Sequence, residues 1–165
     1  MWCAKDCAPA LKRSTARTNI ADVNRAKREL ERLKRIAKAE GVYDDMRFRD
    51  EIAKLEVDIV ALEMLVLRVL SAEKSGKNSL DIAGLLKIKG SEIQQRYTEL
   101  MMHAAGPFAL PFIFEAMDAG WQGNFPGGVV ANAPLAANYF NMRKTTIYGG
   151  SNEVQRNIVA QTVLG

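Results

Sequence analysis

Residues 45–74 read DMRFRDEIAKLEVDIVALEMLVLRVLSAEK, and this stretch decides the fold. Its apolar residues recur in steps that place side chains on one face of an α-helix. The members of this face are Ile52, Leu55, Ile59, Leu62, Leu65, Val66 and Val69. Asp44 and Asp45 come just before them and offer a side-chain cap for the first turn. We therefore predict a long helix that ends near Lys74.

The sequence on both sides shows the same periodicity. Upstream, apolar residues at helical spacing predict a helix over about 18–40, and Gly41 follows as a residue suited to a left-handed stop. Downstream, residues 75–78 are typical of a turn, and Asn78 or Ser79 can cap a third helix. The apolar residues of that helix are Leu80, Leu85, Leu86, Ile93, Tyr97, Leu100 and Met101. Three long amphipathic helices with short connections predict an all-α fold, an antiparallel (up-down) four-helix bundle.

Glycine and proline interrupt the helical pattern over 106–134, which predicts a long loop before the last helices. Loops of this length inside a compact domain are uncommon and are often functional. The segment also carries aromatic residues that a solvated linker would not need, namely Phe108, Phe112, Phe114, Trp121 and Phe125. Two interpretations stay open: the aromatic side chains hold the loop against the bundle, or they form a surface for a partner domain.

Two shorter helices are predicted after this loop. The first covers about 136–142, and the second follows Gly149 and Gly150 and carries Val154, Ile158, Val159 and Val163. Asn152 and Gln155 have the spacing of a capping box, which predicts that Asn152 caps this last helix.

Composition limits the class of protein. The 165 residues fit one domain, and 48% hydrophobic with 25% charged residues is typical of a globular protein. We expect residues 1–16 to be a poorly ordered tail and residues 17–165 to form the bundle. The sequence contains no apolar run long enough to span a bilayer and its start does not resemble a signal peptide, so we expect a cytoplasmic protein.

Metal and nucleic-acid sites are not predicted. Cys3 and Cys7 have no matching Cys or His pair, and His103 is the single histidine, so we expect no metal site. The basic residues of the first helix, which include Arg28 and Arg35, alternate with glutamates. They favour a solvated face over a surface for cofactor phosphates, and no nucleic-acid motif accompanies them.

The turn 149–152, Gly-Gly-Ser-Asn, is the candidate site. Two glycines allow a tight turn close to a ligand, and the free N–H groups of the following helix attract phosphate or carbonyl oxygen. From these residues alone, a plain capped turn and a ligand-binding turn both remain open. The segment lacks the lysine of a phosphate-binding P-loop and the third glycine of a dinucleotide fingerprint.

Three segments carry a resemblance to a known family. Residues 147–160 read IYGGSNEVQRNIVA, and the chain ends in Val-Leu-Gly. Residues 17–21 read RTNIA and are followed by KRELERL at 27–33, while LLKIKG at 85–90 is followed by EIQQ. Together they resemble the C-terminal helical domain of acyl-CoA dehydrogenases, over roughly residues 14–165.

The resemblance implies a flavoprotein oxidoreductase of fatty acid metabolism. In that family the bundle lies against FAD and the acyl chain and contributes to the dimer and tetramer core, so FAD, acyl-CoA and a homo-oligomer are the implied cofactor and partners. Ser151, Glu153 and Gly150 correspond to FAD-binding positions, and Tyr148 and Gly149 correspond to positions near the CoA thioester.

The same resemblance implies that this chain lacks the catalytic base. Relatives place a glutamate either just before the glycine of the signature or in the first helix, where this chain has Gly149 and Ala16. Neither residue accepts a proton, so we assign no catalytic residue. The resemblance also places most of the FAD site in domains of the family that this sequence does not contain, so we expect the isolated chain not to hold FAD tightly and to be inactive. The alternative function is a non-catalytic helical interaction module that associates with itself or with a complete dehydrogenase subunit.

Overall fold

The computed structural model describes residues 22–75, 80–118, 121, 123 and 132–164. Within these ranges every regular element is helical, which confirms the all-α prediction. The five α-helices are α2 (Val23–Ala39), α3 (Met46–Lys74), α4 (Leu80–Ala105), α5 (Leu135–Met142) and α6 (Asn152–Leu164). Short 3₁₀ turns connect them, namely η1 (Val42–Asp44), η2 (Pro107–Ala109), η3 (Phe114–Met117) and η5 (Arg143–Thr146).

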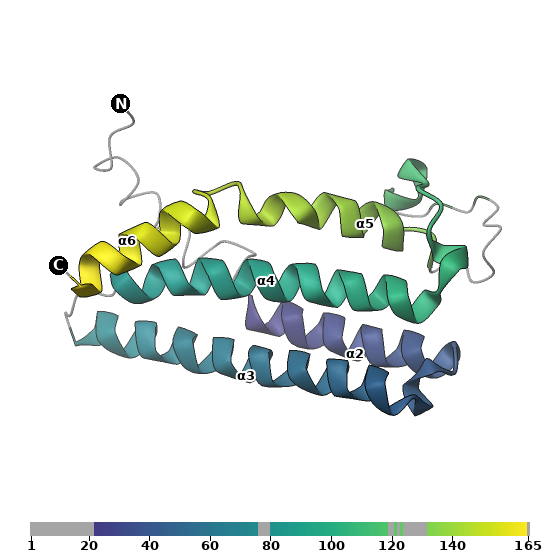
Figure 1. Cartoon of the computed structure of the whole chain (residues 1–165), viewed down its shortest axis with the longest axis horizontal. Coiled ribbons are helices and arrows are strands. Elements are labelled where there is room, and N and C mark those ends of the chain that lie inside the picture. The colour runs from purple at the N-terminus through teal and green to yellow at the C-terminus, as the bar shows by residue number, and fades with distance from the viewer. Residues whose placement is uncertain (1–21, 76–79, 119–120, 122, 124–131, 165) are drawn as a thin grey trace.

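Helix α4 lies at the centre of the structure. It packs against α2 and α3 on one side and against α5 and α6 on the other, and α2, α3 and α4 run in alternating directions (Figure 1). Two short helices therefore share the fourth side of the predicted bundle. The connection between α5 and α6 lies over the middle of α4, and this connection holds the glycine turn.

Helix α2 begins later than the sequence predicts. Asp22 has extended backbone angles, and its carboxylate Oδ1 accepts a hydrogen bond of 2.9 Å from the Arg25 amide, so Asp22 is the N-cap and the predicted start at residue 18 is wrong. The apolar spacing extends to Ile20, outside the described residues, but the cap ends the helix. At the other end Gly41 has a φ of 74°, which confirms the predicted left-handed stop.

Helix α3 has the predicted bounds. The Asp45 carboxylate accepts a hydrogen bond of 2.9 Å from the Arg47 amide and so caps the first turn, while Asp44 lies in η1. The last residue of the helix is Lys74, as predicted. The predicted cap of α4 at Asn78 or Ser79 lies outside the described residues, and α5 matches the predicted helix over 136–142 to within one residue.

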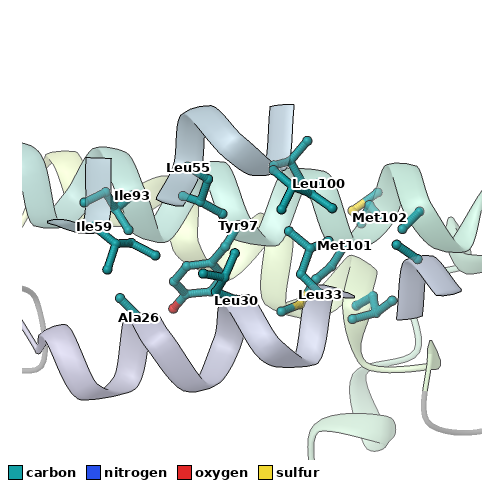
Figure 2. Packing of buried hydrophobic residues seen from close by; sticks show 14 of the residues in the cluster. Ala26, Leu30, Leu33, Leu55, Ile59, Ile93, Tyr97, Leu100, Met101 and Met102 are labelled. Atoms are coloured by element: carbon teal, nitrogen blue, oxygen red, sulfur yellow. The ribbon is translucent and has the colours of Figure 1, made fainter. Parts of the chain in front are cut away.

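The core lies between α2, α3 and α4 (Figure 2). Leu33, Leu55, Ile59 and Leu62 are at most 2% exposed, and Leu100 of α4 packs into the same cluster. Each side chain buried to this extent contributes about 1.5–3 kcal/mol. These residues are the ones that the helical periodicity assigns to the inner face, so the sequence pattern and the packing agree.

The described part of the loop over 106–134 supports both interpretations of its aromatic residues. Trp121 and Ile113 pack on Ala116 and Ala133 in a small second cluster within the loop, and η2 and η3 contact α4 and α5. Phe114 is 66% exposed. Phe112 is 54% exposed and meets Phe140 of α5 edge-on, with 5.9 Å between ring centroids. The side chain of Phe108 and all of Phe125 lie outside what the structure describes.

Among the described residues, no helix combines the length and the apolar character that a membrane crossing requires. No three His, Cys, Asp or Glu side chains come together there as a metal site would require. Cys3 and Cys7 precede the described residues.

Candidate functional site

The candidate site is the exposed turn that leads from η5 into α6. Tyr148, Gly149 and Gly150 are exposed, and Ser151 is partly buried. Gly149 and Gly150 have φ angles of 71° and 89°, a region that L-residues with a side chain rarely adopt. The glycine pair therefore bends the chain sharply and leaves its backbone accessible.

Ser151 caps α6, and the prediction of Asn152 as the cap is wrong. The Ser151 hydroxyl accepts a hydrogen bond of 3.4 Å from the Val154 amide, and α6 begins at Asn152. Serine and asparagine are both favourable N-cap residues, so the spacing alone could not show which of Ser151 and Asn152 caps the helix. The Gln155 side chain donates to the carbonyl oxygen of Gly149 at 3.5 Å, whereas in a capping box it would accept from the backbone N–H of the cap residue.

Asn152 is buried and joins α6 to α4. The Lys87 ammonium donates a hydrogen bond of 2.7 Å to Asn152 Oδ1, and Asn152 Nδ2 donates one of 3.2 Å to the Ser91 hydroxyl. Ser91 in turn donates to the carbonyl oxygen of Ile88 at 2.8 Å. Lys87 and Asn152 are both less than a tenth exposed, so this polar cluster is shielded from water and fixes the first turn of α6.

Lys87 is the group with the most unusual electrostatic environment at the site. Burial lowers the pKa of its ammonium group, and the charge of Glu153 partly opposes this effect. Among the described residues no carboxylate lies within salt-bridge distance of Lys87, so its hydrogen bond to Asn152 stabilises the charge. Asn152 therefore holds both the turn and the buried cation.

Gln95 anchors the segment that precedes the glycine turn. Its amide Nε2 donates to the carbonyl oxygen of Arg143 at 3.2 Å, and the Arg143 guanidinium donates back to the carbonyl oxygen of Gln95 at 3.0 Å. The same guanidinium lies over the Tyr139 ring, 4.3 Å from its centroid. Helix α4 thus holds the turn from both sides, through Gln95 before it and through Lys87 and Ser91 after it.

Glu153 is exposed at the N-terminal end of α6. Hydrogen bonds from its own backbone amide and from the Ser151 hydroxyl lower the pKa of this carboxyl. The carboxylate is therefore ionised at neutral pH and presents a hydrogen-bond acceptor beside the turn. A ligand group with N–H or O–H donors suits this position better than a second anion.

The five site residues inferred from the resemblance are neighbours in the sequence. The structure places Tyr148, Gly149, Gly150 and Ser151 in the turn and Glu153 in the first turn of α6. Of the two positions at which the resemblance implies a base in relatives, Gly149 is exposed and Ala16 lies outside the described residues. Gly149 has no side chain and so cannot take up a proton.

The family model for the C-terminal domain of acyl-CoA dehydrogenase matches residues 12–164. The chain belongs to this family. The acyl-CoA dehydrogenase match covers the whole described bundle and includes the anchored turn. It leaves only the first eleven residues and the last one outside.

Curated acyl-CoA dehydrogenases are similar to the chain at low identity. The acyl-CoA dehydrogenase IpdE1 of Mycolicibacterium smegmatis is 28% identical over 138 residues, which cover 84% of this chain and 30% of that protein. IpdE1 of Mycobacterium tuberculosis is 27% identical over 141 residues, which cover 84% and 31%. The chain therefore spans about a third of the length of these relatives.

Solved structures share the fold. The steroid ACAD named Tcur3481-Tcur3483 aligns with a TM-score of 0.68 at 23% identity, over 88% of this chain and 35% of that one. PigA with FAD and proline aligns with a TM-score of 0.65 at 16% identity, over 86% and 33%. At these low identities, the comparison with solved structures shows a shared fold and nothing further.

Proposed function

We propose that the chain forms the C-terminal helical part of a flavin-dependent acyl-CoA dehydrogenase, which removes hydrogen from the α and β carbons of an acyl-CoA thioester. The observation that supports this proposal is the exposed glycine turn at 148–153, which α4 holds from both sides. Such a turn keeps its geometry before a ligand arrives, and ligand sites are typically preformed in this way.

The residues of the turn fit an edge of FAD. A side chain added at Gly149 would meet no atom within 4 Å, so the backbone has open space beside it for a flat ligand. We propose that Gly150, Ser151 and Glu153 hold the flavin, with the Glu153 carboxylate as acceptor for its donors. Tyr148 and Gly149 would then lie toward the thioester. Bound FAD would supply the hydride acceptor.

The chain by itself should be inactive. Removal of the α proton requires a base at the reacting carbon, and the two positions at which the family places a glutamate carry Gly149 and Ala16. The turn supplies binding and orientation, and the chain covers about a third of its relatives.

A titration with FAD tests the proposal. In ¹H–¹⁵N NMR spectra, FAD should shift the amide signals of residues 148–153, and Ser151→Ala should reduce these shifts. Thr162→Ala, an exposed hydroxyl residue on the same helix, should leave them unchanged. If the shifts are missing, or if Ser151→Ala leaves them intact, the turn is not a flavin site. Acyl-CoA-dependent dye reduction by the chain with added FAD would contradict its inactivity.

A specific observation also favours the alternative, a module that associates with itself. Helix α3 exposes a second apolar row opposite its core face, which we call the α3 stripe, formed by Val57, Val60, Met64 and Leu67. These side chains are 52–69% exposed and recur in steps of three, four and three, the spacing of a helix–helix seam. A helix that is apolar on two faces is typical of one that is buried on both. We propose that a homo-oligomer covers this row.

Sedimentation velocity over a wide concentration range tests this self-association. Met64→Glu should shift the chain to monomer because it places a charge in the seam, and it should keep the helical circular dichroism because the residue is exposed. Leu110→Glu, also at an exposed apolar residue but away from α3, serves as the matched control. A wild type that stays monomeric at every concentration would overturn the proposal.

A further inference from the structure

A small cavity lies between α2, α4 and α5, away from the glycine turn. Its volume is about 50 Å³, which is enough for a small ion or a few water molecules. The polar residues that line it are Arg25, Glu29 and Arg32 of α2, Tyr97 and Thr98 of α4, and Asn138 of α5. The cavity is open to solvent on one side, so a small solute can enter without unfolding of the bundle.

The Tyr97 hydroxyl is a buried donor that lacks a partner. Tyr97 is 3% exposed, its hydroxyl reaches toward α2 (Figure 2), and its O–H proton has no acceptor among the described residues. Burial raises the pKa of this phenol, although the Arg25 guanidinium partly opposes the shift through its charge and through a side-chain hydrogen bond to the phenol oxygen. The hydroxyl is therefore protonated at neutral pH and can donate. Unsatisfied buried groups are rare and call for an explanation, such as a missing ligand or water.

The charges around the cavity favour an anion. Glu29 is the single acidic residue in the lining, and its carboxylate lies 3.7 Å from the Arg32 guanidinium. Arg25 has no salt bridge to any described residue. A guanidinium offers several donors in one plane, a geometry that matches the oxygens of a carboxylate or phosphate.

We propose that this cavity binds a small oxyanion, a carboxylate or phosphate group held by the Arg25 guanidinium and the Tyr97 hydroxyl. Asn138 adds an amide at the α5 side of the cavity. The site would join three helices through one ligand, and it does not depend on the flavin site proposed above. A water-filled cavity is the competing explanation, and it gives no selectivity for anions.

Titration with sodium phosphate and with sodium acetate, each at constant ionic strength balanced with sodium chloride, tests the proposal by calorimetry and by thermal unfolding. At least one of the two anions should bind saturably at one site and raise the Tm with its concentration. Binding of both indicates a carboxylate-sized site, and binding of phosphate alone indicates a phosphate site. If neither anion binds better than chloride, the cavity holds water and the proposal is wrong.

Three variants locate the binding. Tyr97→Phe removes only the hydroxyl, and Arg25→Gln removes the charge. Each should weaken binding by about tenfold, the loss expected for one hydrogen bond to a charged group. Arg28→Gln, an exposed arginine on the same helix, should leave binding unchanged. Circular dichroism shows whether each variant folds, and a folded Tyr97→Phe that binds as tightly as the wild type would overturn the assignment.

Discussion

Replacement of Asn152 by alanine should destabilise the fold far more than the loss of a surface amide would. Asn152 Oδ1 accepts the 2.7 Å hydrogen bond from the Lys87 ammonium, and both side chains are buried. The substitution leaves Ser91 and the buried cation without this amide. The perturbation therefore acts on α4 and on the turn together, although the removed group belongs to α6.

The expected loss in the free energy of unfolding is about 2–3 kcal/mol. A hydrogen bond to a charged group contributes about 1.5–3 kcal/mol, and a buried ion pair that loses one partner costs about 3–5 kcal/mol. The acceptor here is a neutral amide, so the lower part of this span applies. For a chain of this size the Tm should fall by roughly 4–12 °C.

The loss should depend on pH, and the sign follows from the lowered pKa of Lys87. Between its folded pKa and the ordinary value of 10.5, the unfolded chain binds more protons, so the contribution of Lys87 to stability rises with pH. Asn152→Ala should lower the folded pKa further. A neutral amine has less need of the amide, so the difference between variant and wild type should shrink as the pH approaches 10.5.

Urea unfolding followed by circular dichroism measures this loss. Asn157→Ala, an exposed asparagine of the same helix, is the control and should stay within about 0.5 kcal/mol of the wild type. Lys87→Met removes the charge, so Asn152→Ala should cost much less in that background. Equal losses for Asn152→Ala and Asn157→Ala, or no rescue by Lys87→Met, would refute the reasoning.

Three further outcomes are expected. Leu33→Ala opens a cavity in the core and should cost about 2.7–5 kcal/mol by urea unfolding, because Leu33 is fully buried. Gly150→Ala should cost about 1–2 kcal/mol in the same assay, because the residue has a φ of 89°. Lys54 and Arg96 lower the pKa of Glu51, so stability should fall below pH 4.5 in thermal scans, and Glu51→Gln should flatten this part of the pH profile.

The sequence predicts the long helices well because their information is local. The spacing of Leu55, Ile59 and Leu62 assigns the inner face of α3, and Asp45 and Gly41 mark boundaries by their own side-chain and backbone preferences. The predicted start of α2 is wrong because the apolar periodicity continues on the N-terminal side of the cap at Asp22. A period can extend beyond a helix, whereas a cap ends it.

The site was only partly predictable, because its anchors are distant in the sequence. Tyr148, Gly149, Gly150, Ser151 and Glu153 form one contiguous segment, so a local pattern finds them. Lys87 and Asn152 are 65 residues apart, and the local sequence around either residue does not indicate that the two are in contact. A signal did exist. Lys87 and Ser91 stand four residues apart on a helix face that continues in Gln94 and Thr98, and all four polar side chains are buried.

Tyr97 is a second residue whose role depends on contacts that are distant in the sequence. Its spacing in α4 predicts a core residue, and the ring is indeed buried. The fate of the hydroxyl depends on Arg25, far away in the sequence, and on how α2 and α5 close around it. Periodicity assigns a side chain to one face of a helix, but it does not predict the hydrogen-bond partner of a polar atom on that side chain.

The attachment of α6 divides this helix into two parts that should open independently. Asn152 and Gln155 are buried, and a side chain added at Gly84 of α4 would come within 2.8 Å of Val159, so α6 lies close to α4 up to that point. Beyond it, Val163 and Leu164 are 63% and 84% exposed. In hydrogen–deuterium exchange the final turn should therefore fray first while the first turn stays protected. The glycine turn is thus insulated from motion at the far end of its own helix.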